Sequence, residues 1–132
     1  MKKIFQHIFR NDNPEIPRIV EKNFKSLFKH ANSIEWISSS NEYEALFYDK
    51  GIEKIARFSS NGSLIEVRVN HSPQDFDRFR LSPQYFESTI MNYIEINKED
   101  STFHELIIKQ ADFKRLLILL NNKYEIVKEE VL

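Results

Sequence analysis

IEKIARFSSNGSLIEVRV, the stretch Ile52–Val69, decides the fold of this chain. Two runs in which apolar residues alternate with polar ones flank the Asn-Gly dipeptide at 61–62, the strongest short-range signal of a β-hairpin. A two-residue turn would place Phe58 opposite Ile65. A three-residue turn with a bulge would instead place Phe58 opposite Leu64. Both alternatives predict two neighbouring antiparallel strands.

The same pattern returns 60 positions later, and residues 34–69 align with the following copy without a gap. A one-residue slip would turn every side chain of a strand to the other face of its sheet. Two copies that stay in phase therefore predict the same structural unit built twice. The pairs that carry this alignment include Ile34 with Ile94, Glu35 with Glu95, Trp36 with Ile96, Leu46 with Leu106 and Phe47 with Ile107.

Outward from the hairpin, the sequence predicts an α+β fold with the order α-β-β-β-β repeated twice. One helix is expected over 16–31, where apolar residues recur every three or four positions, and a second from about Pro83 to Tyr93. The units cover about 14–69 and 82–131, are joined by a linker over 70–81, and form a single domain over 1–132. The expected strands are 33–39, 42–49, 52–59, 63–69, 94–98, 102–109, 112–120 and 123–131.

Composition narrows the classes of function. The 132 residues suit one domain, and 41% apolar residues with 11 Phe supply a core. With no Cys, thiolate metal sites and a Cys nucleophile are excluded, and 2 Gly argue against Gly-rich phosphate loops. A net charge of −1 provides no overall field to hold nucleic acid or an anionic membrane.

The N-terminal residues Met1–Arg10 begin with two lysines, as a signal peptide does, but Gln6 and His7 interrupt the apolar stretch. A secretory signal needs about 7–15 apolar residues and a small-residue cleavage site. No run of about 18 apolar residues predicts a membrane span. The chain as given is therefore expected to be cytoplasmic, or periplasmic or secreted if its native N-terminus was trimmed.

The order of elements and its landmarks resemble the PepSY-like, beta-lactamase-inhibitor-protein-like (BLIP-like) domains of many secreted bacterial proteins. The resemblance covers residues 16–131 and implies one long curved antiparallel sheet with the helices on one face. It also implies that the concave face, with which the name-giving inhibitor grips its enzyme, is the face that binds a partner. The landmarks are Pro17 to Phe28 and Ala31, Ile34-Glu35-Trp36, Tyr43-Glu44-Ala45-Leu46-Phe47, Ala56-Arg57-Phe58 with Asn61-Gly62, and Leu81-Ser82-Pro83.

No residue pattern points to catalysis or to a metal or other cofactor. The four histidines, His7, His30, His71 and His104, have no ligand-like spacing. No nucleophile motif of a hydrolase and no phosphate-binding loop is present. We therefore expect no catalytic residue, no metal site and no cofactor.

Two surfaces are candidates for binding a partner. The first is the sheet face away from the helices, where we place Leu46, Tyr48, Arg57, Arg68 and Leu117. Stacking of nucleic acid bases on this face is disfavoured, because glutamates lie among its aromatic and basic residues. The second surface is the edge formed by the linker.

The linker carries Phe76, Arg78 and Phe79, and aromatic and Arg residues are frequent in binding hot spots. The alternative is that Phe76 and Phe79 plug the seam between the two units while the charges face water. The sequence therefore predicts a non-catalytic module that binds a protein or peptide, with no nucleic acid or membrane partner. The alternative function is a small structural or self-associating protein, such as a homodimer.

Overall fold

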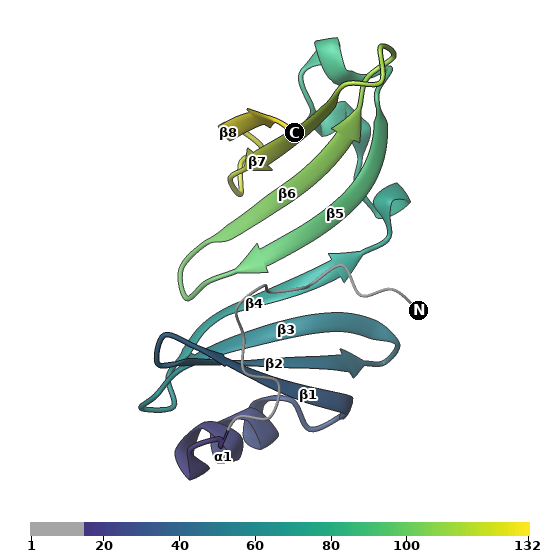
Figure 1. Cartoon of the computed structure of the whole chain (residues 1–132). Helices are drawn as coiled ribbons and strands as arrows, with labels where there is room; N and C mark the ends of the chain where they lie inside the picture. Colours follow the sequence, from purple (N-terminus) through teal and green to yellow (C-terminus); the bar gives the residue numbers. More distant parts are fainter. Residues whose placement is uncertain (1–14) are drawn as a thin grey trace. The chain divides into compact units, whose positions relative to one another are not determined.

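The computed structural model describes residues 15–132 as one α-helix, three short 3-10 helices and eight β-strands (Figure 1). The strands form an antiparallel sheet in which their order follows the chain, from β1 to β8. The α+β class is therefore confirmed. The fold divides into two compact units, Met1–Val67 and Arg68–Leu132, which are described separately below.

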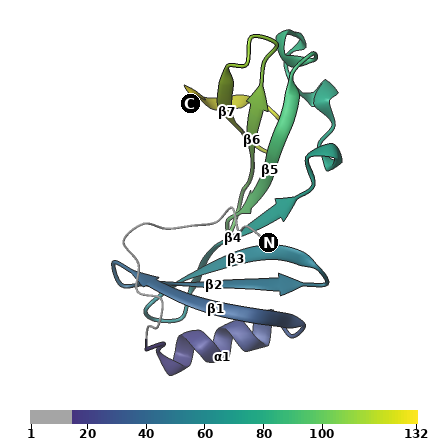
Figure 2. The ribbon, with the colours of Figure 1, turned by 45° about the vertical axis from the view of Figure 1, so that its right-hand side comes forward.

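In the first unit, α1 (Arg18–Leu27) covers one face of β1 (Ala31–Ser39), β2 (Glu42–Asp49) and β3 (Ile52–Ser59), and Figure 2 shows this arrangement. The helix begins after Pro17, whose carbonyl accepts hydrogen bonds from Val20 and Glu21, both 3.1 Å. It is shorter than predicted, because Ala31 already belongs to β1. The core of this unit consists of Val20, Phe24, Ala45, Phe47, Ala56 and Phe58.

The hairpin between β3 and β4 (Leu64–His71) has the three-residue loop. Ser59 N–H donates to Ser63 O (2.9 Å), and Gly62 N–H donates to Ser59 O (3.0 Å). Gly62 has φ 92°, the left-handed region that glycine adopts without a steric penalty. Asn23 on α1 donates a side-chain hydrogen bond to Gly62 O (2.8 Å) and thereby ties the helix to this turn.

The second unit contains β5 (Thr89–Asn97), β6 (Thr102–Lys109), β7 (Arg115–Leu120) and β8 (Ile126–Val131). The predicted helix over 83–93 is wrong. The 3-10 helix Pro83–Tyr85 forms its first residues, a turn follows over 86–88, and β5 begins at Thr89. A bulge between Ile90 and Asn92 explains the error, because it puts Ile90 and Tyr93 into the same core. That three-residue spacing imitates the period of a helix.

Within residues 68–132, no α-helix covers the core of the second unit. Its cover comes from the segment 73–86, which contains the 3-10 helices η1 (Pro73–Asp75), η2 (Arg78–Arg80) and η3 (Pro83–Tyr85). Phe76, Leu81 and Tyr85 from this segment are buried. The full core consists of Phe76, Leu81, Tyr85, Ile90, Tyr93, Leu106, Ile108, Leu116, Ile118 and Leu120.

The strand pairing of the second unit does not keep the ungapped 60-residue register of the sequence. Trp36 opposes Ala45 across β1 and β2. Sixty positions later, Ile96 opposes Phe103, and not Glu105. The shift follows from the position of the hairpin turn. The two-residue turn between β1 and β2 is 40–41. The turn between β5 and β6 also has two residues, 99–100, closed by a hydrogen bond from Lys98 N–H to Ser101 O, and lies one position earlier in the repeat.

This slip changes which side chains face the core. Phe47 on β2 is 1% exposed in the core of the first unit. Its sequence equivalent Ile107 on β6 is half-buried and lies on the face opposite to the buried neighbours Leu106 and Ile108. The prediction that Phe47 and Ile107 occupy equivalent positions is therefore wrong.

Candidate functional site

In the first unit, the predicted binding face lies on the side of the sheet away from α1, because Ala45 and Phe47 on β2 point toward the helix. Leu46 is only 3% exposed, so its side chain offers little surface to a partner. Tyr48 is half-buried, and its hydroxyl donates to Glu53 Oε2 (3.3 Å). The face therefore presents polar groups at its surface and apolar groups below it.

Arg57 on β3 lies between two carboxylates on this face. Its guanidinium donates to Glu42 Oε1 (2.8 Å) and to Glu66 Oε1 (3.0 Å). Burial disfavours the charged guanidinium, but the hydrogen bonds to the two glutamates outweigh that cost and raise the pKa of Arg57. Its charge is already compensated within the unit, which makes it a poor anchor for an acidic partner.

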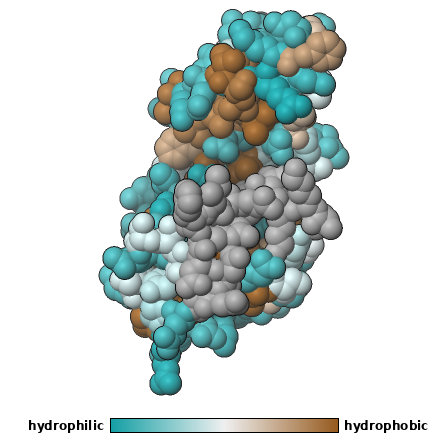
Figure 3. All heavy atoms as spheres, viewed as in Figure 1, coloured by the Kyte–Doolittle hydropathy of each residue, from teal (hydrophilic) through white to brown (hydrophobic). Residues whose placement is uncertain are grey.

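In the second unit, the face opposite the core carries large apolar side chains. Leu117 on β7 opposes Ile107 on β6, while Leu119 opposes Glu105. Phe103 lies on the same face and has Lys98 Nζ 5.6 Å from its ring centre. We name Phe103, Ile107, Leu117 and Leu119, all half-buried, the β6–β7 apolar face. Figure 3 shows apolar residues gathered over these two strands.

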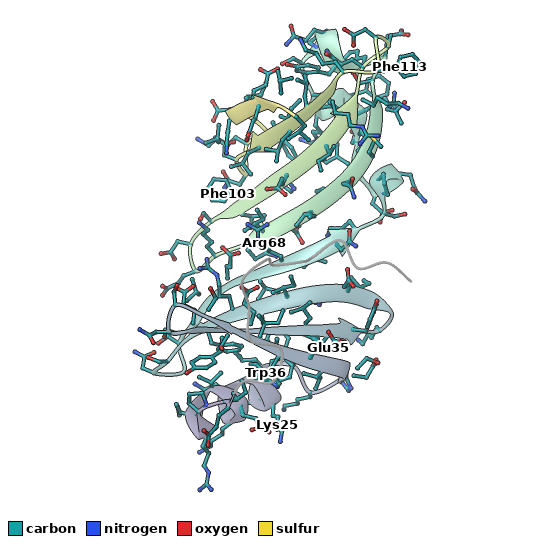
Figure 4. All side chains as sticks on the ribbon, viewed as in Figure 1. Lys25, Glu35, Trp36, Arg68, Phe103 and Phe113 are labelled. Atoms are coloured by element: carbon teal, nitrogen blue, oxygen red, sulfur yellow. The ribbon has the colours of Figure 1, made fainter. Side chains whose placement is uncertain are left out.

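Sequence reasoning found only Leu117 of these four residues. Ile107 was missed because the 60-residue alignment matched it to Phe47, a core position. A signal was present in β7, which reads RLLILL and is apolar on both of its faces. A strand with one face in water should alternate between apolar and polar residues. Arg68 on β4 is half-buried, and Figure 4 shows its position together with that of Phe103.

The three predicted residues of the linker edge lie in different surroundings. Phe76 is buried in the core of the second unit. Arg78 is exposed and donates from Nη1 to the carbonyl of Phe86 (2.8 Å). Phe79 is 71% exposed, with its ring 5.2 Å from that of Phe86 in an edge-on arrangement, so it does not act as a plug.

An open cavity of about 310 Å³ lies beside this segment. It is bounded by η1 and the first residues of β5, and Phe76 forms part of its wall. Arg78 supplies the one charged side chain among its lining residues. Those residues are Pro73, Gln74, Phe76, Arg78, Thr89 and Ile90.

Histidine and tyrosine rings form a stack in the second unit. His71 lies on Tyr93 (4.9 Å between ring centres), and His104 lies on Tyr124 (4.9 Å). The Tyr93 hydroxyl is 2.8 Å from His104 Nδ1. Burial lowers the pKa of His104 and raises that of Tyr93 to about 12. The neutral imidazole can therefore accept the tyrosine proton in a hydrogen bond.

The two ends of this stack carry charged groups. The Arg80 guanidinium lies 4.5 Å from the ring centre of Tyr124, a cation–π contact. At the other end, His71 Nε2 is 3.2 Å from Glu95 Oε1. Glu95, which the sequence marks as the repeat of Glu35, thus takes part in side-chain packing within the second unit.

Among residues 15–132, no group of three or more His, Cys, Asp or Glu side chains is placed to hold a metal ion. In the same part of the chain, no buried side-chain nitrogen or oxygen lacks a hydrogen-bond partner. No helix described by the structure is long and apolar enough to cross a membrane. The candidate sites described above are surfaces of the two units.

No family model and no curated protein matches the sequence. Among solved structures, a BLIP-like protein from Bacteroides fragilis has a TM-score of 0.76 at 17% identity, with 91% of this chain and 89% of that chain covered. A DUF2874 family protein from Bacteroides uniformis has a TM-score of 0.77 at 16% identity and coverage of 89% and 90%.

A third structure, from Bacteroides eggerthii, is of a protein whose description suggests a periplasmic location. It has a TM-score of 0.78 at 14% identity, with 89% of this chain and 90% of that chain covered. Similarity at such low identity establishes a shared fold rather than a shared activity. The resemblance predicted from the sequence is confirmed at this level: the chain has the BLIP-like fold.

Proposed function

We propose that this chain is a non-catalytic module that binds a protein or peptide through the β6–β7 apolar face of its second unit. The observation that carries the proposal is the composition of that face. Phe103, Ile107, Leu117 and Leu119 are all large and apolar at positions where a solvated antiparallel sheet usually carries polar side chains. Contiguous apolar surface of this kind is typical of interaction sites.

The charged groups around this face fit a protein partner. Glu105 lies between Ile94 and Leu119, and Lys128 opposes Leu119 from β8. A protein interface usually combines an apolar centre with a polar rim, and the rim favours correct partners over wrong ones. The chain as a whole has a net charge of only −1, which supports a protein or peptide more than nucleic acid.

The absence of catalysis is part of the proposal. It is supported by the use that the structure makes of its ionisable side chains. Arg57 bridges two glutamates, and His104 is packed between tyrosines. These groups contribute to packing and pairing rather than converging on one open pocket.

We also infer that the two four-stranded meanders are variants of one repeated plan. Each places four antiparallel strands in chain order, and the first strand of each carries a bulge near its start. The bulges lie between Asn32 and Glu35 in β1 and between Ile90 and Asn92 in β5.

The protein from Bacteroides eggerthii supports the periplasmic alternative for location.

The test is a capture experiment with quantitative mass spectrometry. Wild-type protein, Leu117→Glu, Ile107→Glu and the control Lys25→Glu are immobilised and exposed to extract of the native cell. Lys25 lies on α1 in the other unit with its side chain 69% exposed. We expect a partner that wild type and control retain and both face variants lose. Equal retention by all four folded proteins would refute the proposed face.

A further inference from the structure

Among the strands that the structure describes, β8 is an edge strand, because the strand order ends with it and its partner is β7. Each residue from Ile126 to Val131 is exposed. The exposed residues include apolar ones, with Val127 at 54% and Val131 at 60%. An open edge of this kind presents backbone N–H and C=O groups that can bond another strand.

The hydrogen-bond pattern shows which backbone groups are available. Leu132 N–H donates to Arg115 O (3.0 Å), so these two residues form a hydrogen-bonded pair. Such pairs alternate along an antiparallel ladder, which makes Glu130 the next residue bonded to β7. The backbone groups of Glu129 and Val131 therefore point away from β7.

The sequence of this edge is complementary to itself. Residues 126–132 read IVKEEVL, which is nearly symmetric in residue type about Glu129. Against an antiparallel second copy, Lys128 would lie opposite Glu130 of that copy, and Val127 opposite its Val131. Lys128 and Glu130 share one face of the sheet, since their charged groups are 3.3 Å apart within the chain.

We propose that this protein forms a two-fold symmetric homodimer by antiparallel pairing of β8 with β8 of a second copy, with the axis at Glu129. The outward backbone of Glu129 then makes the central hydrogen-bonded pair. Lys128 and Glu130 take the adjacent pairs without backbone hydrogen bonds, in which facing side chains are closest. Symmetry creates two such ion pairs for each dimer.

Alternative registers are less favourable. An axis at Lys128 would place that lysine against its own copy, and an axis at Glu130 would do the same with a glutamate. Like charges directly opposite each other destabilise a strand pair. The proposed axis also has one such contact, Glu129 with its copy on the opposite face of the sheet. It alone offsets that contact with two Lys128–Glu130 ion pairs. The Glu129 carboxylate already accepts a hydrogen bond from the Tyr85 hydroxyl.

The experiment measures self-association of the full chain by analytical ultracentrifugation. We expect wild-type dimers whose fraction rises with concentration. Lys128→Glu and Glu130→Lys should each weaken self-association by about tenfold or more, since each replaces two attractive pairs with two repulsive ones. An equimolar mixture of the two variants restores opposite charges at both positions and should form a heterodimer. Lys25→Glu on α1 is the control with unchanged dimerisation.

Circular dichroism of each variant verifies that it is folded. A wild type that stays monomeric up to about 1 mM would overturn the proposal. So would dimers that persist in both single variants, or a mixture that stays monomeric. The inference goes beyond the proposed partner-binding function and does not depend on it, because the β8 edge and the β6–β7 apolar face are tested by different substitutions and different measurements.

Discussion

The two units cover the same kind of sheet in different ways. In the first, α1 lays Val20 and Phe24 over the strands. In the second, the 3-10 turns of the segment 73–86 supply Phe76, Leu81 and Tyr85 instead. The difference teaches that a four-stranded meander needs apolar side chains over one face, whereas the backbone that carries them can vary. The stabilising free energy comes from the burial of apolar surface.

The opposite faces of the two units also differ. The first carries the Glu42–Arg57–Glu66 network over buried Leu46. The second carries half-buried apolar residues of β6 and β7. A partner that recognises charge would prefer the first face, and one that offers apolar groups would prefer the second. Substitutions in the two units can therefore distinguish the contributions of the apolar cover, the turns and the exposed sheet face to stability and binding.

The largest expected effect concerns the cores. Phe47→Ala in the first unit and Phe76→Ala in the second should each cost about 3–5 kcal/mol of the free energy of unfolding, the usual range for a buried Phe. Phe28 packs against the core of the first unit but is only half-buried, so Phe28→Ala should cost less. Chemical denaturation measures all three. Near-equal midpoints for wild type and Phe76→Ala would show that the 3-10 segment is not a true cover.

A second effect concerns the turn beneath α1. A Cβ on Gly62 would lie 2.8 Å from Ile19 Cγ1 and 2.9 Å from Asn23 Nδ2, in a backbone conformation with φ 92°. Gly62→Ala should therefore destabilise the chain by about 2 kcal/mol, from strain and displaced side chains. The matched control is Gly51→Ala, where φ is 81° but no atom lies within 4 Å of the new Cβ. Equal losses would mean that backbone strain alone matters and helix contact does not.

The second unit has a turn in which the opposite change should help. Phe113, in the β6–β7 loop, has φ 68° and is 77% exposed. Phe113→Gly should raise the free energy of unfolding by about 1 kcal/mol, because a bulky residue is strained in the left-handed region. The substitution removes the long contact between the Phe113 ring and Lys109, whose Nζ lies 5.4 Å from the ring centre. Thermal melting provides the measurement, and a lower melting temperature would contradict this interpretation of the loop.

Acid should weaken the second unit through His104. Burial lowers the pKa of His104 below the 6.5 of the free side chain, so the unfolded chain binds this proton more tightly. Stability should then fall as the pH drops from 6.5 toward the folded pKa, and be fully present above 6.5. Urea denaturation at pH 7 and pH 5 compares wild type with His104→Gln. A pH dependence that is identical in the variant would assign the effect to other groups.

The smallest expected effect on stability is at Tyr48. Its hydroxyl makes a long, partly buried hydrogen bond to Glu53, so Tyr48→Phe should change the free energy of unfolding by less than about 1.5 kcal/mol. Tyr48→Ala adds the loss of the ring. If this face also contributes to binding, Tyr48→Ala should weaken the captured complex by about 2 kcal/mol with little change in melting temperature. If Tyr48→Ala lowered both the binding of the complex and the melting temperature, Tyr48 would belong to the core.

The strands were largely predictable from the sequence, and the second helix was not. Alternation of apolar residues and the Asn-Gly turn located β1 to β4, because a period of two has few other causes. The bulge at Ile90 produced a three-residue spacing that a helix also produces. The same limit applied to the candidate site. Leu117 is predicted on the open face, whereas Ile107 is missed because the turn between β5 and β6 lies one position earlier than the repeat predicts.

The pairing of every strand with its neighbour in sequence has a kinetic consequence. In the described pairs, hairpins such as Ser40-Asn41 and Lys50-Gly51 join the partners by only a few residues. Closing such short loops costs little chain entropy. Folding rate falls as contacts become more distant in sequence, so sheets with long connections fold slowly. This topology should fold faster than a β-sandwich of equal length, one hairpin adding to the next.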